Sequence, residues 1–176
     1  MNTSRSTAIE AIDVLNYLIA DFVAGTYVFI DYRQRFKSGI LNIEQLSAVQ
    51  RMCFSHLALS FCKLLEFWDH YHQLVPPIHH EDLKKLKARI RKKGVKNFRN
   101  KVAGHIMDTK SHRPLQHSEI MLLLDGLIGK HADDFLYWIN NPLDNTYPNT
   151  VISIVETIRN TIAHKYVITP DEIIEK

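Results

Sequence analysis

Apolar residues along this chain recur at the three- and four-residue spacing that is typical of amphipathic helices. The pattern predicts a first helix over about 6–23 and a long second helix over about 43–74. The apolar stripes are Ile9, Ile12, Leu15, Ile19 and Phe22 in the first helix, and Leu46, Val49, Cys53, Leu57, Leu64 and Trp68 in the second. The segment between them, GTYVFIDYRQRFKSG, fits either a continuation of the first helix or a short strand.

Two prolines in VPPIHHED end the second helix, because proline cannot continue a helix. A third helix then runs to near Asp108, and the loop TKSHRPLQHSE closes on a cap at His117-Ser118. The stretch EIMLLLDGLIGKHADDFLYWIN reads as another helix, and a last helix covers about 150–166. Strand alternation and hairpin turns are absent from the pattern. We therefore predict an all-α bundle of about five to six helices, in one domain over 1–176.

The composition changes this picture little. A chain of 176 residues with 45% hydrophobic and 23% charged residues suits one globular domain. No apolar run reaches the ~18 residues that a membrane span needs, and the N-terminus lacks the apolar core and cleavage site of a signal peptide. We therefore expect a cytoplasmic protein without a membrane partner. Cys53 and Cys62 are nine residues apart on one predicted helix, about 180° around it, so they cannot form a disulfide with each other.

Charge is distributed unevenly along the chain. The run KKLKARIRKKGVKNFRNK, 84–101, holds ten of the 22 basic residues and no acidic residue, which leaves 12 basic against 19 acidic residues elsewhere. A solvated helix face normally mixes signs and gains pairs four residues apart, whereas this run repels itself. Such a field attracts phosphate backbones, so we predict RNA binding. The predicted RNA-binding residues are Lys84, Lys85, Lys87, Arg89, Arg91, Lys92, Lys93, Lys96 and Lys101.

Two segments place Arg-Asn shortly before a histidine: FRNKVAGHIMD, 98–108, and IRNTIAHKY, 158–166. Asn160 and His164 are four apart and share a helix face, which Arg159 can reach with its long side chain. The three groups offer a planar cation for a phosphate, an amide that orients it and an imidazole that titrates near neutrality. Together they suit the cleavage of a phosphodiester without a metal.

The C-terminal segment resembles the R-x4-H-x-Y signature of the HEPN superfamily, and RNKVAGH is similar to that superfamily's broader R-x4–6-H pattern. The surrounding residues are similar to the abortive-infection and toxin branch. The resemblance implies an HEPN-like helical bundle that forms homodimers, cuts RNA as a metal-independent endoribonuclease and acts in phage defence or with an antitoxin protein. The candidate catalytic residues that it implies are Arg159, Asn160, His164 and Tyr166 in the second motif, and Arg99, Asn100 and His105 in the first.

A chain with two such motifs leaves alternatives open: one motif is structural, or both converge in one cleft. The broader alternatives are a non-catalytic RNA-binding or dimerisation module of the same fold, and a helical scaffold for an acidic protein. We expect no cofactor, and no metal at DHYHQLVPPIHHED, because its histidines and acids lack an established ligand spacing. We also expect Glu66 to lie on a partly buried face and to pair with an arginine of either motif.

Overall fold

The computed structural model describes residues 2–103 and 113–174 of the chain, and these residues form helices and loops with no strand. The all-α prediction is therefore confirmed for this part of the chain. The helices are α1 (Asn2–Lys37), α2 (Ile43–Tyr71), α3 (His80–Lys92), α4 (Val95–Phe98), α5 (His117–Ile128), α6 (Ala132–Ile139), α7 (Val151–Tyr166) and α8 (Asp171–Ile174). With two helices of only four residues, α4 and α8, the described part has more helices than the five to six predicted.

Several helix boundaries in the structure differ from those predicted from the sequence. The ambiguous segment after Val23 continues α1 to Lys37, so the first helix is about twice as long as the pattern predicted. The predicted cap at His117-Ser118 lies one residue too late, since α5 is capped by Gln116, whose backbone N–H donates to Glu119. The helix predicted after that cap is two helices, because Gly129 adopts a positive φ of 89° between α5 and α6.

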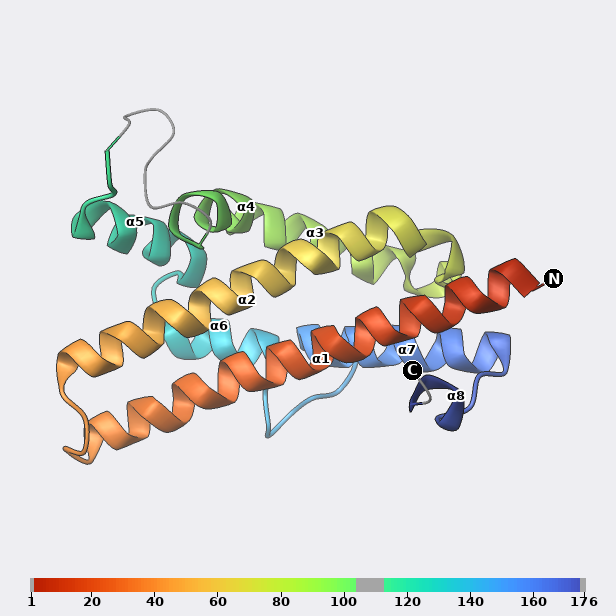
Figure 1. Ribbon diagram of the computed structural model, residues 1–176, viewed down its shortest axis with the longest axis horizontal. Coiled ribbons are helices and arrows are strands. Elements are labelled where there is room, and N and C mark those ends of the chain that lie inside the picture. Colours follow the sequence, from red (N-terminus) through yellow and green to blue (C-terminus); the bar gives the residue numbers. More distant parts are fainter. Residues whose placement is uncertain (1, 104–112, 175–176) are drawn as a thin grey trace.

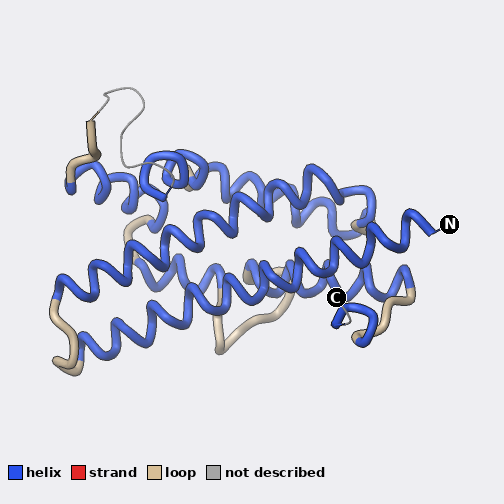
Figure 2. The backbone as a smooth tube through the Cα atoms, in the orientation of Figure 1, coloured by secondary structure: helices blue, strands red, loops and turns tan. Residues whose placement is uncertain are grey.

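Helices α1 and α2 form a long antiparallel pair, and the other helices lie along it (Figure 1). Helix α7 packs against α1, and α4 packs against α2. Helix α6 closes the core between them with a cluster of aromatic rings. Phe61 lies 4.9 Å from Phe22 of α1 and stacks at 5.3 Å on Trp138 of α6, measured between ring centroids. The backbone tube in Figure 2 shows how much of the described chain is helical and how short most connections are.

By length and composition, α1 passes the test for a membrane-spanning helix over Arg5–Lys37, with a mean hydropathy of 1.3 in its most apolar stretch. This differs from the expectation that no segment is apolar enough. Core helices pass the same test, and the inner stripe of α1 lies in the core. That stripe includes Ala8, Ala11, Ile12, Leu15, Leu18 and Phe22, each at most 1% exposed.

A close approach between α1 and α2 occurs at Gly25. A Cβ atom built on Gly25 would lie 2.7 Å from Cδ2 and 2.9 Å from Cγ of Leu57, which is far inside normal contact distance. Leu57 is fully buried, so it has little room to move away. Glycine is needed here because it lets the two helix backbones come together.

The basic segment is not one helix. Helix α3 ends at Lys92, and Gly94 adopts a left-handed conformation with φ 66° and ψ 22°. The chain then resumes as α4 and continues as a π-helical turn, Arg99–Ala103. Because glycine adopts a positive φ without the usual Cβ penalty, it can redirect the chain at this point.

Polar side chains tie the loop before α7 to two helices. The Tyr147 hydroxyl donates to Oδ2 of Asp82 at 2.6 Å and contacts Nδ1 of His79 at 3.0 Å. The other ring nitrogen of His79 lies 3.2 Å from the hydroxyl of Thr161, which itself donates to the carbonyl of Thr157. These contacts join the start of α3, the Tyr147 loop and α7.

Replacing Gly25 with alanine tests the helix crossing. We expect G25A to lower the free energy of unfolding by about 1 kcal/mol, because overpacking against Leu57 costs about 1–3 kcal/mol and exceeds the helix propensity that alanine gains. The matched control is Gly126→Ala in α5, where a Cβ meets nothing within 4 Å. It should stabilise the protein by up to about 1 kcal/mol in urea unfolding. Equal stabilisation by both variants would contradict the close crossing.

The Tyr147 contacts predict a pH effect. Burial, together with the hydrogen bond and charge of Asp82, raises the pKa of Tyr147 to about 12. Because the folded state favours the neutral phenol, this stabilisation is present below the ordinary tyrosine pKa of 10.0 and is lost as the pH rises through about 12. We expect Y147F to unfold about 1–3 kcal/mol more easily at pH 8, with a gap that narrows between pH 10 and 12. Urea unfolding between pH 8 and 12 measures the difference in unfolding free energy between the wild type and Y147F. A difference that does not change with pH would contradict the link between folding and the ionisation of Tyr147.

Candidate functional site

The C-terminal motif lies on α7, on the side that packs against α1. Thr150 caps the N-terminus of α7, since its hydroxyl accepts a hydrogen bond from the Ser153 backbone N–H. Two turns later the half-buried Arg159 donates from Nη1 to Oδ1 of Asn16 at 3.1 Å. It also donates from Nε and Nη2 to Oδ1 of Asn160, at 3.0 and 2.9 Å. The structure thus brings the predicted Arg159 and Asn160 together and adds Asn16 of α1.

The guanidinium of Arg159 is held by amides and not by an acid. Among the described residues its hydrogen-bond partners are two side-chain amide oxygens, and no carboxylate forms an ion pair with it. Neutral partners fix its direction and leave its charge uncompensated. It lines a pocket of about 330 Å³ whose other walls come from Ile12, Asn16, Asn160, Ala163, Ile168 and Pro170. This pocket can receive a small anion.

His164 and Tyr166 lie at the end of α7. His164 is exposed, one turn beyond Asn160, and within the described chain its ring has no hydrogen-bond partner. Tyr166 is half-buried against the core, with the ammonium of Lys165 5.1 Å from its ring centroid. His164 can therefore reach solvent and exchange protons, whereas Tyr166 mainly packs.

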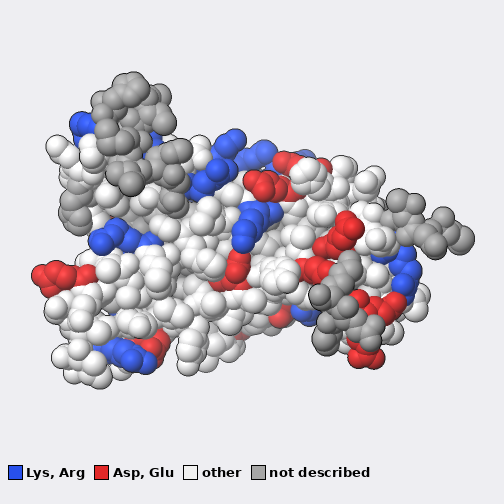
Figure 3. All heavy atoms as spheres, viewed as in Figure 1, with Lys and Arg blue, Asp and Glu red and all other residues white. Residues whose placement is uncertain are grey.

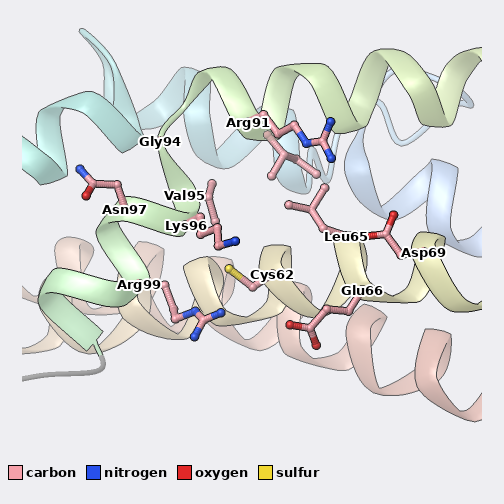
Figure 4. A pocket seen from close by; sticks show the side chains of 11 residues that line it. Cys62, Leu65, Glu66, Asp69, Arg91, Gly94, Val95, Lys96, Asn97 and Arg99 are labelled. Atoms are coloured by element: carbon pink, nitrogen blue, oxygen red, sulfur yellow. The ribbon is translucent and has the colours of Figure 1, made fainter.

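The central motif lies elsewhere in the molecule. Arg99 begins the π-helical turn and lines a second pocket, of about 420 Å³, formed with α2 and α3 (Figure 4). Asn100 is exposed and does not line that pocket, and His105 lies outside the described residues. The two pockets share no lining residue. The described residues of one chain therefore do not place Arg99 and Arg159 in a common cleft.

Part of the basic segment holds the fold together. The Lys93 ammonium donates to the carbonyls of Leu127 and Ile128 at 3.0 and 3.3 Å, at the end of α5. It also lies 4.7 Å from the ring centroid of Phe135. Arg89 lies 4.3 Å above the ring of Trp138. Burial lowers the pKa of both cations, and Arg89 lowers that of Lys93 further. Lys93 and Arg89 are two of the predicted RNA-binding residues, and their side chains contact α5 and α6.

Other cations of the segment meet acids from outside the run. Lys87 pairs with Asp69 of α2 at 2.7 Å, and its hydrogen bond and its charge lower the pKa of Asp69. Lys85 lies 4.0 Å from Glu81 and 3.9 Å from Asp82. The self-repulsion that the sequence suggested is thus partly relieved by neighbouring elements.

Four cations of the run are exposed and have neither an ion-pair partner nor a ring contact in the described part of the chain: Lys84, Arg91, Lys92 and Lys96. Arg89 is also exposed, but its guanidinium lies over Trp138. Lys101 is half-buried. Figure 3 shows lysine and arginine side chains gathered along the edge where α3 and α4 lie. These exposed cations are the ones that a polyanion could contact.

The expectation for Glu66 is wrong in two respects. Its side chain is exposed and not partly buried, and it forms no ion pair with the described residues. It does line the same pocket as Arg99.

The histidine-rich segment 69–82 is used in packing. His80 contacts the carbonyl of Val75 through Nε2 at 2.8 Å, His72 packs on Trp68, and His79 belongs to the Tyr147 network. Within the described residues no group of three or more His, Cys, Asp or Glu side chains could hold a metal ion. Both cysteines are buried and free, as their spacing predicted, and burial raises the pKa of the Cys53 thiol.

Comparison with known proteins adds the fold alone. No family model and no curated protein matches the chain. A solved structure of an integron cassette protein from the mobile metagenome of V. paracholerae superposes with a TM-score of 0.77 at 21% identity. The match covers 90% of this chain and 96% of the other. The two proteins share an all-α fold over nearly their whole lengths.

The division of the basic segment into structural and exposed members gives a stability prediction. We expect Lys93→Ala to lower the free energy of unfolding by about 1–2 kcal/mol, because it leaves the last carbonyls of α5 without their donor. Its sequence neighbour supplies the control: Lys92→Ala, on the exposed side, should change stability by less than about 0.5 kcal/mol. Urea unfolding at neutral pH compares the two, and equal effects would contradict the assignment of Lys93 to the fold.

Proposed function

We propose that this protein is a metal-independent endoribonuclease of the HEPN type, acting as a homodimer, with its reaction centre at Arg159, Asn160 and His164. The proposal joins the R-x4-H-x-Y resemblance to the uncompensated guanidinium beside an exposed imidazole. A role as a phage-defence effector, or as a toxin with an antitoxin partner, rests on that resemblance alone. The all-α fold is compatible with the proposal and is shared with the integron cassette protein.

The observation that carries the proposal is the way Arg159 is held. Two amide oxygens hold its guanidinium at the wall of a pocket, and no acid in the described part of the chain pairs with it. A carboxylate partner would neutralise the guanidinium, whereas amide oxygens accept its hydrogen bonds and leave its positive charge in place. Here the free charge is available for the non-bridging oxygens of a phosphodiester, where negative charge grows in the transition state.

The proposed reaction needs only the chain's own groups. The 2′-oxygen of RNA attacks the adjacent phosphorus while a histidine removes its proton, and the bond from phosphorus to the 5′-oxygen breaks. The leaving oxygen takes a proton from an imidazolium, which in a dimer can come from the second subunit. The products are a 2′,3′-cyclic phosphate and a 5′-hydroxyl. His164, exposed on the face of Asn160, is the proton carrier in this scheme.

The exposed cations Lys84, Arg91, Lys92 and Lys96 form the RNA-binding surface in this proposal. Each phosphate that they contact releases counterions, so RNA affinity should fall steeply as salt increases.

The second candidate function is an RNA-binding module without catalysis. One observation favours it: within one chain, no group among the described residues orients the His164 ring. Catalytic histidines usually have such a partner, because it fixes the tautomer. A dimer could supply this partner, whereas a monomer would only bind RNA.

Cleavage of a labelled RNA in EDTA separates the two candidates. We expect H164A and R159Q each to lower the cleavage rate by about 10²-fold or more, while RNA affinity changes little in H164A. Arg159→Lys should also be impaired, since it keeps the charge but loses the planar fork. The matched control is His131→Ala, another exposed histidine.

Cleavage that survives in both H164A and R159Q would refute this reaction centre. Tight, salt-sensitive RNA binding without cleavage by the wild-type protein would establish the module instead. Sedimentation of the wild-type protein measures whether it is a dimer under the assay conditions.

A further inference from the structure

The pocket of about 420 Å³ between α2, α3 and α4 is separate from the Arg159 pocket and has its own chemistry. Its volume lies within the range of about 300–1,000 Å³ that small-ligand pockets occupy. Apolar side chains from three helices form part of its wall: Cys62, Leu65, Ile90 and Val95. Cys62, Ile90 and Val95 are almost fully buried, so this wall is rigid.

Arg99 is unusual within this pocket. Its Nε is buried, yet it has no hydrogen-bond partner among the described residues. A buried donor without an acceptor is unfavourable by about 1–3 kcal/mol, and more when the group is charged. Such a donor points to an acceptor that the described chain does not supply, such as a water molecule, an ion or a ligand. In Figure 4 the guanidinium of Arg99 and the ammonium of Lys96 both point into the pocket.

The charges around the pocket divide into two ends. Lys96 and Arg99 lie at one end, whereas Arg91 points from α3 toward the side of Asp69, whose pKa its charge helps to lower. Glu66 and Asp69 lie on α2 at the opposite end. Asp69 is already paired with Lys87, so Glu66 is the one lining acid without an ion pair in the described chain. The pocket therefore presents cations for an anionic group and, across an apolar wall, a carboxylate that accepts hydrogen bonds.

We propose that this pocket binds a nucleoside monophosphate unit. Its phosphate contacts Lys96 and Arg99, its base lies against Leu65 and Val95, and hydrogen-bond donors of the base or ribose meet Glu66. The inference rests on the proposed function, since an RNA-cutting protein encounters ligands with these three features together. It deepens that function by adding a nucleotide subsite that is distinct from the reaction centre. The unit comes either as a free nucleotide or as part of an RNA strand.

Isothermal titration of the intact protein with adenosine 5′-monophosphate, inorganic phosphate and adenosine tests the subsite. We expect the nucleotide to bind at least tenfold more tightly than either phosphate or adenosine alone. R99Q should weaken nucleotide binding by tenfold or more, and Lys96→Gln by a few fold. Lys96 is exposed, so this second variant serves where R99Q impairs folding, which a thermal melt monitors. Lys37→Gln, which removes an exposed cation of α1 that lines neither pocket, should bind the nucleotide as the wild type does.

Glu66→Gln is the most discriminating variant, because we expect it to change the affinities for inorganic phosphate and for the nucleotide in opposite directions. Without the negative charge, inorganic phosphate should bind a few fold more tightly, whereas the nucleotide should bind more weakly because its donors lose the carboxylate. A change of the same sign for both ligands would overturn the proposed orientation. Binding that is lost in R159Q but kept in R99Q and K96Q would place the nucleotide in the other pocket and overturn the inference.

A trinucleotide of RNA separates the two sources of the ligand. If it binds more tightly than the free nucleotide, with the same loss in R99Q, the unit belongs to a strand; if it binds more weakly, the ligand is a free nucleotide. Nucleotide binding without RNA cleavage would sustain the subsite and refute the endoribonuclease. RNA cleavage by a protein that binds no nucleotide at millimolar concentration would refute only the subsite.

Discussion

The contact between α1 and α2 at Gly25 and Leu57 sets the geometry of the whole bundle. A glycine opposite a buried leucine lets two long helices cross with their backbones close, and the rest of the chain is arranged around the pair. Helix α7 packs against α1 and also contacts α3, and α4 packs against α2. As a result each long helix forms one wall of a pocket, with Asn16 of α1 in one and Glu66 of α2 in the other.

Much of the fold could be predicted from the sequence, because helical periodicity reports burial directly. Ile12, Leu15 and Phe22 of the predicted stripe are fully buried, and Ile9 and Ile19 are partly buried against the core. The pattern failed where the backbone changes direction without a change of hydrophobicity. Gly129 breaks an apolar run that reads as one helix, since its positive φ is a property of the folded chain and leaves no mark on the periodicity.

The candidate site was predictable only within one helix. The spacing of Arg159 and Asn160 placed both on α7, and they do share a pocket. Asn16 could not be found in the same way, because it lies 143 residues earlier and its only signal is its position on the partner helix. In the basic segment the sequence assigned too many residues to a site, whereas it missed Asn16. Counting charges treated ten cations alike, whereas packing commits Lys93 and Arg89 to α5 and α6.

The left-handed Gly94 turns this linear run of charge into a concave one. On a single straight helix Arg91 and Lys96 would point about 140° apart, but the turn at Gly94 places both around one hollow. The arrangement of these cations around the hollow therefore depends on a residue with no side chain and no charge. A change of backbone conformation at that one position would rearrange the cations while the isoelectric point of the molecule stays constant.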